Sequence, residues 1–246
     1  LLRKQIITGA LLLCISFASM AQRGDVYQPF YDEDLFYLGF NVGINNNYYN
    51  FNRNVEFASP AAGAVSSINP KNNISLTMGL AGTLRLSTHT LLRLNPTVVI
   101  AGSKNLFTFT RIEYPNGNPT MNAATALINI PLALKIVSDR YNAFHYTDIM
   151  RHYVFVGGKI DYDLVGPNGS IQNSTSGSEP IYKNIFNSLD YGYEMGLGVS
   201  FYLPYATISP EVKFSYGVRN LNKGAPLLSS IRDITSNFVY FTIHVE

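Results

Sequence analysis

Hydrophobic and polar residues alternate strictly along residues 189–204, LDYGYEMGLGVSFYLP. The odd positions from Tyr191 to Leu203 are large and apolar, whereas the even positions from Asp190 to Ser200 are acids, glycines and serine. Because successive side chains of a strand point to opposite faces, this run predicts one strand between two unlike environments. Strands of globular proteins have about 5–6 residues, and a membrane-spanning strand needs about 9–11. The run is long enough to span a membrane, with its small polar face inside a narrow barrel.

The same alternation recurs along the chain and predicts eight strands. Their expected ranges are 35–45, 73–87, 91–101, 126–138, 152–164, 189–204, 206–219 and 234–246, with an extension of the third to residue 110 left open. Pro96, Pro131 and Pro210 fall inside these runs. Proline removes a donor from the ladder, so we expect these three at bulges or near the rims.

The connections between the runs differ in length in a regular way. Long connections, rich in Asn, Gly, Ser and Pro, cover 46–72, 102–125, 165–188 and 220–233, whereas residues 88–90 and the turn around Pro204 are short and 139–151 is intermediate. Outer-membrane barrels have short periplasmic turns, long outer loops and an even number of strands. The chain is therefore predicted to be an all-β, eight-stranded, antiparallel up-and-down transmembrane β-barrel over residues 35–246.

Composition agrees with this class. Only 14% of residues are charged, 13% are aromatic and the formal net charge is +2. A net charge this close to zero argues against a nucleic-acid partner. Because the chain has no Trp, Tyr and Phe must form the aromatic girdles that such barrels carry at the membrane interfaces.

The N-terminal segment resembles a secretory signal peptide. Arg3 and Lys4 precede an apolar stretch, and small residues end at Ala21, after which we expect cleavage. Residues 22–34 then form a short polar lead-in in the periplasm. Cys14 is the only cysteine and lies in the signal, so the mature chain is expected to have neither disulfide nor thiol chemistry. The expected location is the bacterial outer membrane.

The position of a residue within its alternating run also predicts which charged side chains face the lumen. They are Arg85, Arg93, Lys135, Lys159, Asp161, Asp163, Asp190, Glu194, Glu211, Lys213, Arg219, His244 and Glu246. Eight strands leave an interior just wide enough for side chains, and buried charges are costly unless paired. We therefore expect a plugged polar lumen with an ion-pair network. One expected proximity is that of Lys159 and Glu194. A proton or ion path is the alternative use of these groups.

Two groups of residues raise the question of chemistry. Ser215, His244 and Glu246 share the inward face of the last two runs, which keeps a lipid-modifying barrel enzyme open as an alternative, although parity alone cannot place them within hydrogen-bond reach. His145 and His152, with Asp148 between them, lack a recognisable metal-ligand spacing. We expect no catalytic residue, no metal and no cofactor.

Several segments, taken in order, resemble the PorT family of outer-membrane barrels of the Bacteroidota type IX secretion system. They are LFYLGFNVGIN at 35–45, TLLRLNPTVVI at 90–100, INIPLALKIVSDR at 128–140, FYLPYATISPEVKFSYGVRNL at 201–221 and the ending FVYFTIHVE. The resemblance implies a non-enzymatic component needed for protein secretion and, in gliding species, for motility. It supplies no catalytic residues to transfer.

These expectations lead to a hypothesis about partners. A lumen too narrow for a folded protein cannot conduct cargo, so the barrel is expected to act as an accessory, scaffold or assembly factor that contacts membrane lipid and other secretion components, with no small-molecule substrate. The aromatic turn at 139–151 is the candidate partner contact, through Arg140, Tyr141, Phe144, His145, Tyr146 and Arg151. An equally simple interpretation is that these aromatics lie at the inner membrane interface. A generic small pore or adhesin remains an alternative function.

Overall fold

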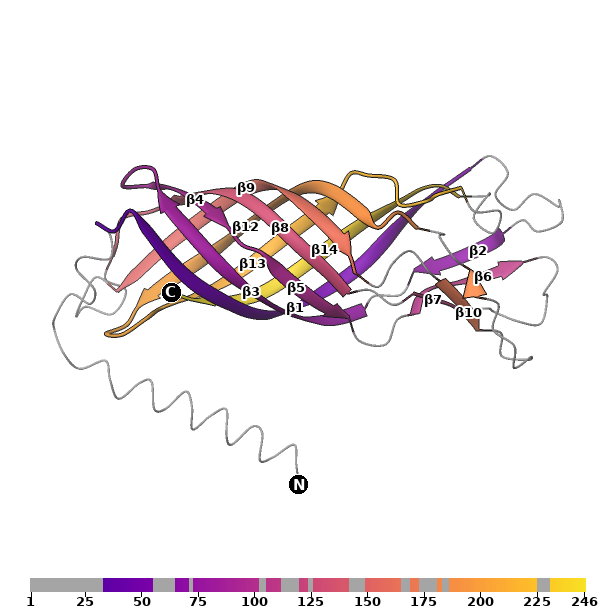
Figure 1. The fold of residues 1–246 in the computed structure, drawn as a ribbon, viewed down its shortest axis with the longest axis horizontal. Coiled ribbons are helices and arrows are strands. Elements are labelled where there is room, and N and C mark those ends of the chain that lie inside the picture. The colour runs from indigo at the N-terminus through magenta and orange to yellow at the C-terminus, as the bar shows by residue number, and fades with distance from the viewer. Residues whose placement is uncertain are drawn as a thin grey trace, which may run out of the picture.

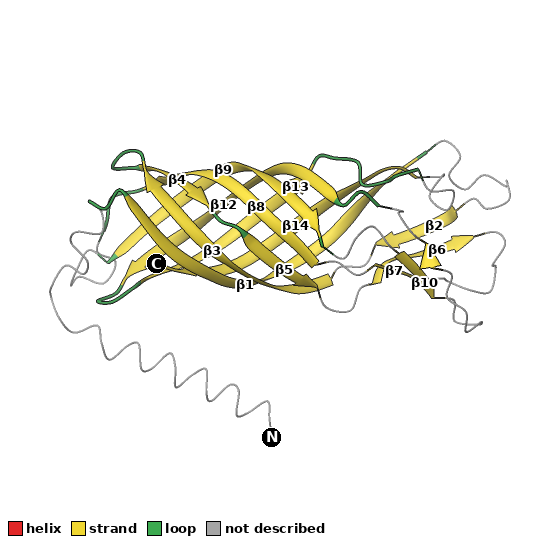
Figure 2. Cartoon of the chain, viewed as in Figure 1, coloured by secondary structure: helices red, strands yellow, loops and turns green. Residues whose placement is uncertain are grey.

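The computed structural model describes residues 33–54, 65–70, 73–101, 105–111, 120–123, 126–141, 149–164, 169–172, 181–182, 186–224 and 231–246. The regular elements within these ranges are β-strands (Figure 2). In this described part of the chain, no helix is both long and apolar enough to cross a membrane. The expected signal peptide and nearly all of the lead-in lie outside it.

The larger sheet closes on itself. Its strands are antiparallel neighbours in the order β1-β14-β13-β12-β9-β8-β4-β3-β5, and β1 also pairs with β3, which completes the ring (Figure 1). They are β1 (Phe36–Arg53), β3 (Asn73–Arg85), β4 (Thr90–Leu94), β5 (Thr97–Ala101), β8 (Ala126–Val137), β9 (Met150–Asp163), β12 (Leu189–Tyr202), β13 (Thr207–Gly217) and β14 (Ile231–Val245). β4 and β5 follow each other along one position of the ring, between β3 and β8. The predicted antiparallel barrel of eight strand positions is confirmed.

The three prolines behave differently from one another. Pro96 separates β4 from β5, and its carbonyl accepts a hydrogen bond from Leu80 N at 3.0 Å. Asn41 Nδ2 donates to Asn95 Oδ1 at 2.6 Å, so a buried side-chain hydrogen bond links β1 to the segment between β4 and β5. Pro131 and Pro210 lie inside β8 and β13, and neither ends its strand. The sequence-based expectation of a bulge or rim position therefore does not describe Pro131, whereas Pro210 lies near the short-turn end of β13.

A second, five-stranded sheet lies beyond one end of the barrel (Figure 1). Its order is β11-β10-β7-β6-β2, from β2 (Val65–Pro70), β6 (Asn105–Arg111), β7 (Thr120–Ala123), β10 (Gly169–Gln172) and β11 (Ile181–Tyr182). These strands come from three of the long connections, at the end of the barrel opposite the C-terminus. The sequence analysis treated the connections as loops. Because β6 belongs to this separate sheet, the third run ends at Ala101.

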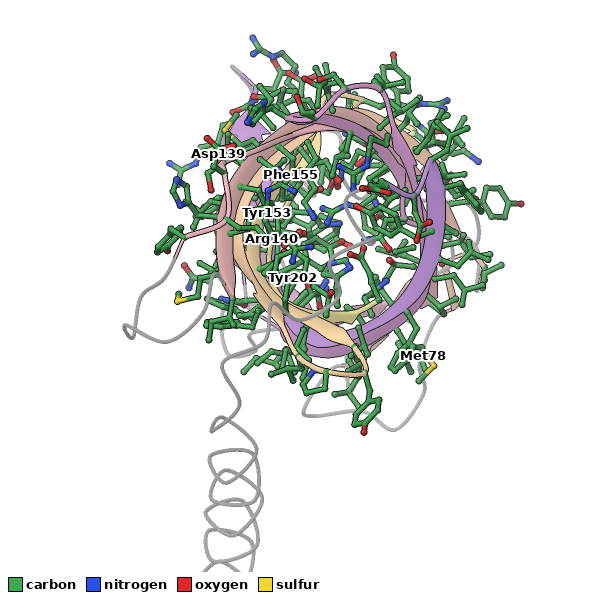
Figure 3. All side chains as sticks on the ribbon, turned by 90° about the vertical axis from the view of Figure 1, so that its left-hand side faces the viewer. Met78, Asp139, Arg140, Tyr153, Phe155 and Tyr202 are labelled. Carbon is green, nitrogen blue, oxygen red and sulfur yellow. The ribbon has the colours of Figure 1, made fainter. Side chains whose placement is uncertain are left out.

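The barrel wall has two unlike faces. Apolar side chains cover its outside, as shown by Leu38, which is 68% exposed, and charged or polar side chains fill the inside, as shown by Arg93, which is 2% exposed. Figure 3 looks along the barrel and shows Tyr153 and Phe155 pointing inward and Met78 pointing outward. The alternation of the sequence therefore corresponds to a lipid face and a filled lumen.

Candidate functional site

The middle of the lumen is organised around Glu211 of β13. Its Oε2 lies 2.7 Å from Arg93 Nη2 of β4 and accepts a hydrogen bond of 3.0 Å from the Tyr153 hydroxyl of β9. Its Oε1 lies 3.5 Å from His244 Nε2 of β14. All four residues are buried. Four strands from different parts of the ring are thus joined across the lumen at one carboxylate.

A second group of charges lies next to this centre, built on β8, β9, β12 and β13. Lys213 Nζ lies 3.1 Å from Glu194 Oε2, and Lys159 Nζ lies 2.6 Å from Asp161 Oδ2. Asn129 connects the two pairs, because its amide donates to Asp161 Oδ1 at 2.6 Å while its oxygen accepts from Lys213 at 3.4 Å. The expected proximity of Lys159 and Glu194 agrees with the register, in which Glu194 lies opposite Gly157, two positions from Lys159. Their ion-pair partners are Asp161 and Lys213 respectively.

Aromatic rings occupy much of the remaining lumen volume. Several cations lie over rings, among them Arg93 over Phe155 at 4.7 Å, Lys135 over Tyr153 at 3.8 Å, Lys159 over Phe238 at 5.1 Å and Lys213 over Tyr240 at 4.4 Å from the ring centroids. A cation over a ring face is attracted by the ring quadrupole, more strongly when water is excluded. Tyr153 and Phe155 were not among the residues predicted to face the lumen, although they alternate in step with Lys159 and Asp161 along β9.

The glycines of β12 make room for two of these rings. Gly196 lies opposite Phe155 and Gly198 lies opposite Tyr153 in the pairing of β12 with β9. A Cβ added at Gly196 would be 2.5 Å from Phe155 Cζ, and one at Gly198 would collide with the Tyr153 hydroxyl. The glycine face of residues 189–204 is therefore the space that β9 fills with aromatic rings.

The other charges assigned to the lumen lie toward its ends. Asp190 is buried and accepts a hydrogen bond of 2.5 Å from the Ser236 hydroxyl. Asp163, Arg219, Arg85 and Glu246 are half-buried. Arg85 Nε donates to the carbonyl of Asp34 at 3.1 Å, which ties the end of the lead-in to the start of the barrel.

Short turns lie at the end of the barrel opposite the second sheet (Figure 1). We call their described residues, 86–89, 138–141, 149 and 203–206, the short-turn rim. His89 Nε2 lies 2.8 Å from Asp139 Oδ1, and this hydrogen bond to the imidazole lowers the pKa of the exposed Asp139 carboxyl. Arg151 is buried and donates to the carbonyl of Ser138 and, at 3.1 Å, to that of Thr88. Two turns are therefore linked both inside and outside the wall.

The candidate partner turn has an arrangement different from the one expected. Arg140 lies with its guanidinium carbon 3.7 Å from the centroid of the Tyr202 ring, and Figure 3 shows both side chains inside the barrel. Tyr141 is exposed and packs edge-on against His152, with ring centroids 5.6 Å apart. Phe144, His145 and Tyr146 lie outside the described residues. The two arginines expected to meet a partner, Arg140 and Arg151, instead point inward and stabilise the rim.

The candidate nucleophile Ser215 and the candidate base His244 do not meet in the structure. In the pairing of β13 with β14, Ser215 lies opposite Phe238 and His244 lies opposite Ser209. Ser215 is six positions from Ser209, or about 20 Å along the strand, so it is out of hydrogen-bond reach of His244. Within the described ranges, no group of three or more His, Cys, Asp or Glu side chains is placed to hold a metal ion.

The lumen leaves little empty space at its short-turn end. A cavity there is bounded by residues such as Arg85, Lys135, Tyr202 and Glu246 and has a volume of about 10 Å³, which is about the space of one water molecule. Charges and rings together therefore close this end of the barrel. What the arrangement can do is hold the wall rigid and present its turns and outer face.

Comparison with solved structures finds small outer-membrane barrels. Neisserial surface protein A is 11% identical, with a TM-score of 0.40 over 84% of this chain and 96% of that one. Ail, the attachment invasion locus protein of Yersinia pestis, is 8% identical, with a TM-score of 0.36 over 85% of this chain and 96% of that one. AlkL, solved in lipid bilayers, is 13% identical, with a TM-score of 0.31 over 92% of this chain and 94% of that one.

Among curated proteins, no sequence matches the chain. A family model described as "Outer membrane protein beta-barrel domain" matches residues 21–223, which is most of the sequence. The match includes the strands from β1 to β13. The closed sheet and its apolar outer face agree with that description. The chain belongs to the outer membrane protein β-barrel family, and it is a protein of the bacterial outer membrane.

Proposed function

We propose that this barrel is a non-enzymatic component of the type IX protein secretion machinery, where it acts as an accessory, scaffold or assembly factor and, in gliding species, contributes to motility. The resemblance of residues 128–140 and 201–221 to the PorT family supports the choice of machinery. The observation that supports the kind of role is the filled lumen, in which Arg93, Tyr153 and His244 meet at Glu211.

A barrel of eight strand positions encloses only enough space for its own side chains. Exported proteins must then cross the outer membrane through another component, and this barrel contributes a surface. Within the short-turn rim, we assign that contact to the aromatic turn at 139–151, because short turns face the periplasm in bacterial outer-membrane barrels. Its described part offers Asp139 and Tyr141, which are exposed.

The experiment substitutes the aromatic turn while leaving the wall unchanged. Replacing Phe144, His145 and Tyr146 with serine, together with Tyr141→Ser, is expected to abolish co-purification of the secretion partners and to reduce secretion of type IX cargo. Tyr205→Ser, in another turn of the same rim, is the matched control and should leave both unchanged.

The fold of each variant is checked by heat-modifiable migration on gels, which reports a closed barrel. Normal secretion by the folded quadruple variant would remove the turn from the proposal. Absence of any type IX component among proteins that co-purify with the wild-type barrel from native membranes would remove the secretion role itself.

A further inference from the structure

The cavity at the short-turn end of the lumen has a positively charged lining. Its volume is about 10 Å³, and the charged side chains among its described lining residues are Arg85, Lys135, Arg151 and Glu246. Among these residues, three cations face one carboxylate. Lys135 and Arg151 are buried, at 3% and 6% exposure, whereas Arg85 at the end of β3 and Glu246 after the end of β14 are half-buried.

Lys135 differs from the other two buried lysines of the lumen. Lys159 and Lys213 each have a carboxylate close to the ammonium, at 2.6 Å and 3.1 Å. Lys135 Nζ lies 3.8 Å from the centroid of the Tyr153 ring, and the described residues place no carboxylate at ion-pair distance from it. The ring attracts the ammonium through its quadrupole, but it carries no negative charge. Lys135 therefore has no partner that compensates its charge.

The surroundings of Lys135 are apolar on the side of the wall. Lys135 lies opposite Leu91 of β4 and opposite Phe155 of β9, and both neighbours belong to a buried hydrophobic cluster that also contains Val137. A buried charge in such surroundings is costly unless it is paired. Two arrangements relieve this cost, namely the loss of the lysine proton or the binding of an anion.

The rest of the cavity lining favours an anion. The guanidinium groups of Arg85 and Arg151 keep their charge in proteins, so the lining stays cationic even beside a neutral lysine. The cavity has about the space of one water molecule. A phosphate ion, or a carboxylate of a partner protein, has several oxygens and is too large for it. A monatomic anion is close to water in size, and chloride is the abundant ion of this kind.

We propose that this cavity binds one chloride ion between Lys135 and Arg151. The ion compensates the lysine charge where water is largely excluded and electrostatic attraction is strong. Ser200, whose hydroxyl lies 2.8 Å from that of Ser209, also lines the cavity. The bound ion adds to the closure of this end of the lumen. The site is independent of the secretion role, since it depends only on the inside of the barrel.

Thermal unfolding tests the site in solution. The purified, folded barrel in a zwitterionic detergent is heated at rising sodium chloride concentration, with sodium gluconate added to keep the ionic strength constant, because gluconate is too large for the cavity. An ion that binds only the folded state raises the unfolding midpoint by mass action. We expect a saturable rise in the wild type and its loss in Lys135→Met.

Leu134→Met is the matched control, because Leu134 is the neighbouring residue on β8 and points outward, with 39% exposure. This variant should keep the chloride response of the wild type. An equal response of the wild type and Lys135→Met would overturn the proposal.

Bromide diffraction tests the position of the ion and needs no variant that has to fold. Crystals of the wild-type barrel grown in sodium bromide should give an anomalous peak beside Lys135 Nζ. Anomalous peaks confined to exposed cations such as Arg232, whose side chain is 68% exposed, would mean an adventitious ion only and would overturn the proposal.

Discussion

At the scale of single residues, the lumen depends on placing buried cations beside carboxylates and aromatic rings. Glu211 accepts from Arg93 and Tyr153 and faces His244, so one carboxylate compensates groups from three other strands. Removing one partner of a buried pair leaves an uncompensated charge in a medium of low dielectric constant, which is more harmful than replacing both partners. A change at one lumenal residue therefore requires a matching change at its partner.

Glu211→Gln is expected to lower the free energy of unfolding by about 3–5 kcal/mol, because the Arg93 charge stays buried without its carboxylate. Denaturant titration of the barrel in lipid vesicles measures this change. Arg93→Met added to Glu211→Gln should recover part of the loss. Asp139→Asn, at the exposed rim, is the control with little effect. Equal stability of Glu211→Gln and the wild type would contradict the account of the lumen.

A second prediction compares a glycine on the inner face of the wall, Gly198, with one on the outer face, Gly158. Gly198→Val should destabilise the barrel by at least about 1–3 kcal/mol, because the added atoms collide with the Tyr153 hydroxyl and the Pro210 carbonyl. Gly158→Val, whose added Cβ would have no heavy atom closer than 3.9 Å, should fold normally. Loss of heat-modifiable migration is the readout, and equal behaviour of the two variants would contradict it.

At the scale of elements, the strands that the sequence predicted are the long ones. β12 and β9 each have 14 residues, which is long enough for the alternation of apolar and polar residues to be recognised. β7, β10 and β11 have four, four and two residues, which is too short for a period to emerge. These three strands were missed for this reason, whereas β2 (VSSINP) does not alternate and β6 was considered only as an extension of the third run. The partners of the charged groups could not be predicted either, because alternation shows which face a side chain is on but not the register between strands.

The second sheet should be dispensable for closing the ring. β5 pairs directly with β8, with Ile100 opposite Ala126. Replacing residues 102–125 with an Asn-Gly turn, which joins antiparallel strands with little strain, is expected to leave a folded, heat-modifiable barrel. A variant that no longer folds would show that β6 and β7 are needed to hold the ring together.

At the scale of the whole molecule, the barrel has two different ends. The short-turn rim lies at one end, and the second sheet, built from the long connections, lies at the other (Figure 1). The sequence predicted this polarity from connection lengths alone. It did not predict that Arg140 and Arg151 turn inward, because a lumenal ring at Tyr202 and the free carbonyls of neighbouring turns attract them only once the fold exists.

Cysteine labelling tests this polarity in intact cells. Asn69→Cys in the second sheet should react with a membrane-impermeant maleimide, and Tyr205→Cys in the short-turn rim should react only after the outer membrane is permeabilised. Both native side chains are exposed. The reverse pattern of labelling would show that the barrel has the opposite orientation in the membrane and that the proposed partner contact lies at the cell surface.

The central claim is that the lumen is filled and that function resides on the surface of the barrel. Planar-bilayer recording of the purified, folded protein tests this claim most directly. We expect the bilayer current to remain at baseline, because buried ion pairs and aromatic rings fill the middle of the lumen. Reproducible, stepwise single-channel currents from the wild-type protein would show an open path and contradict the account.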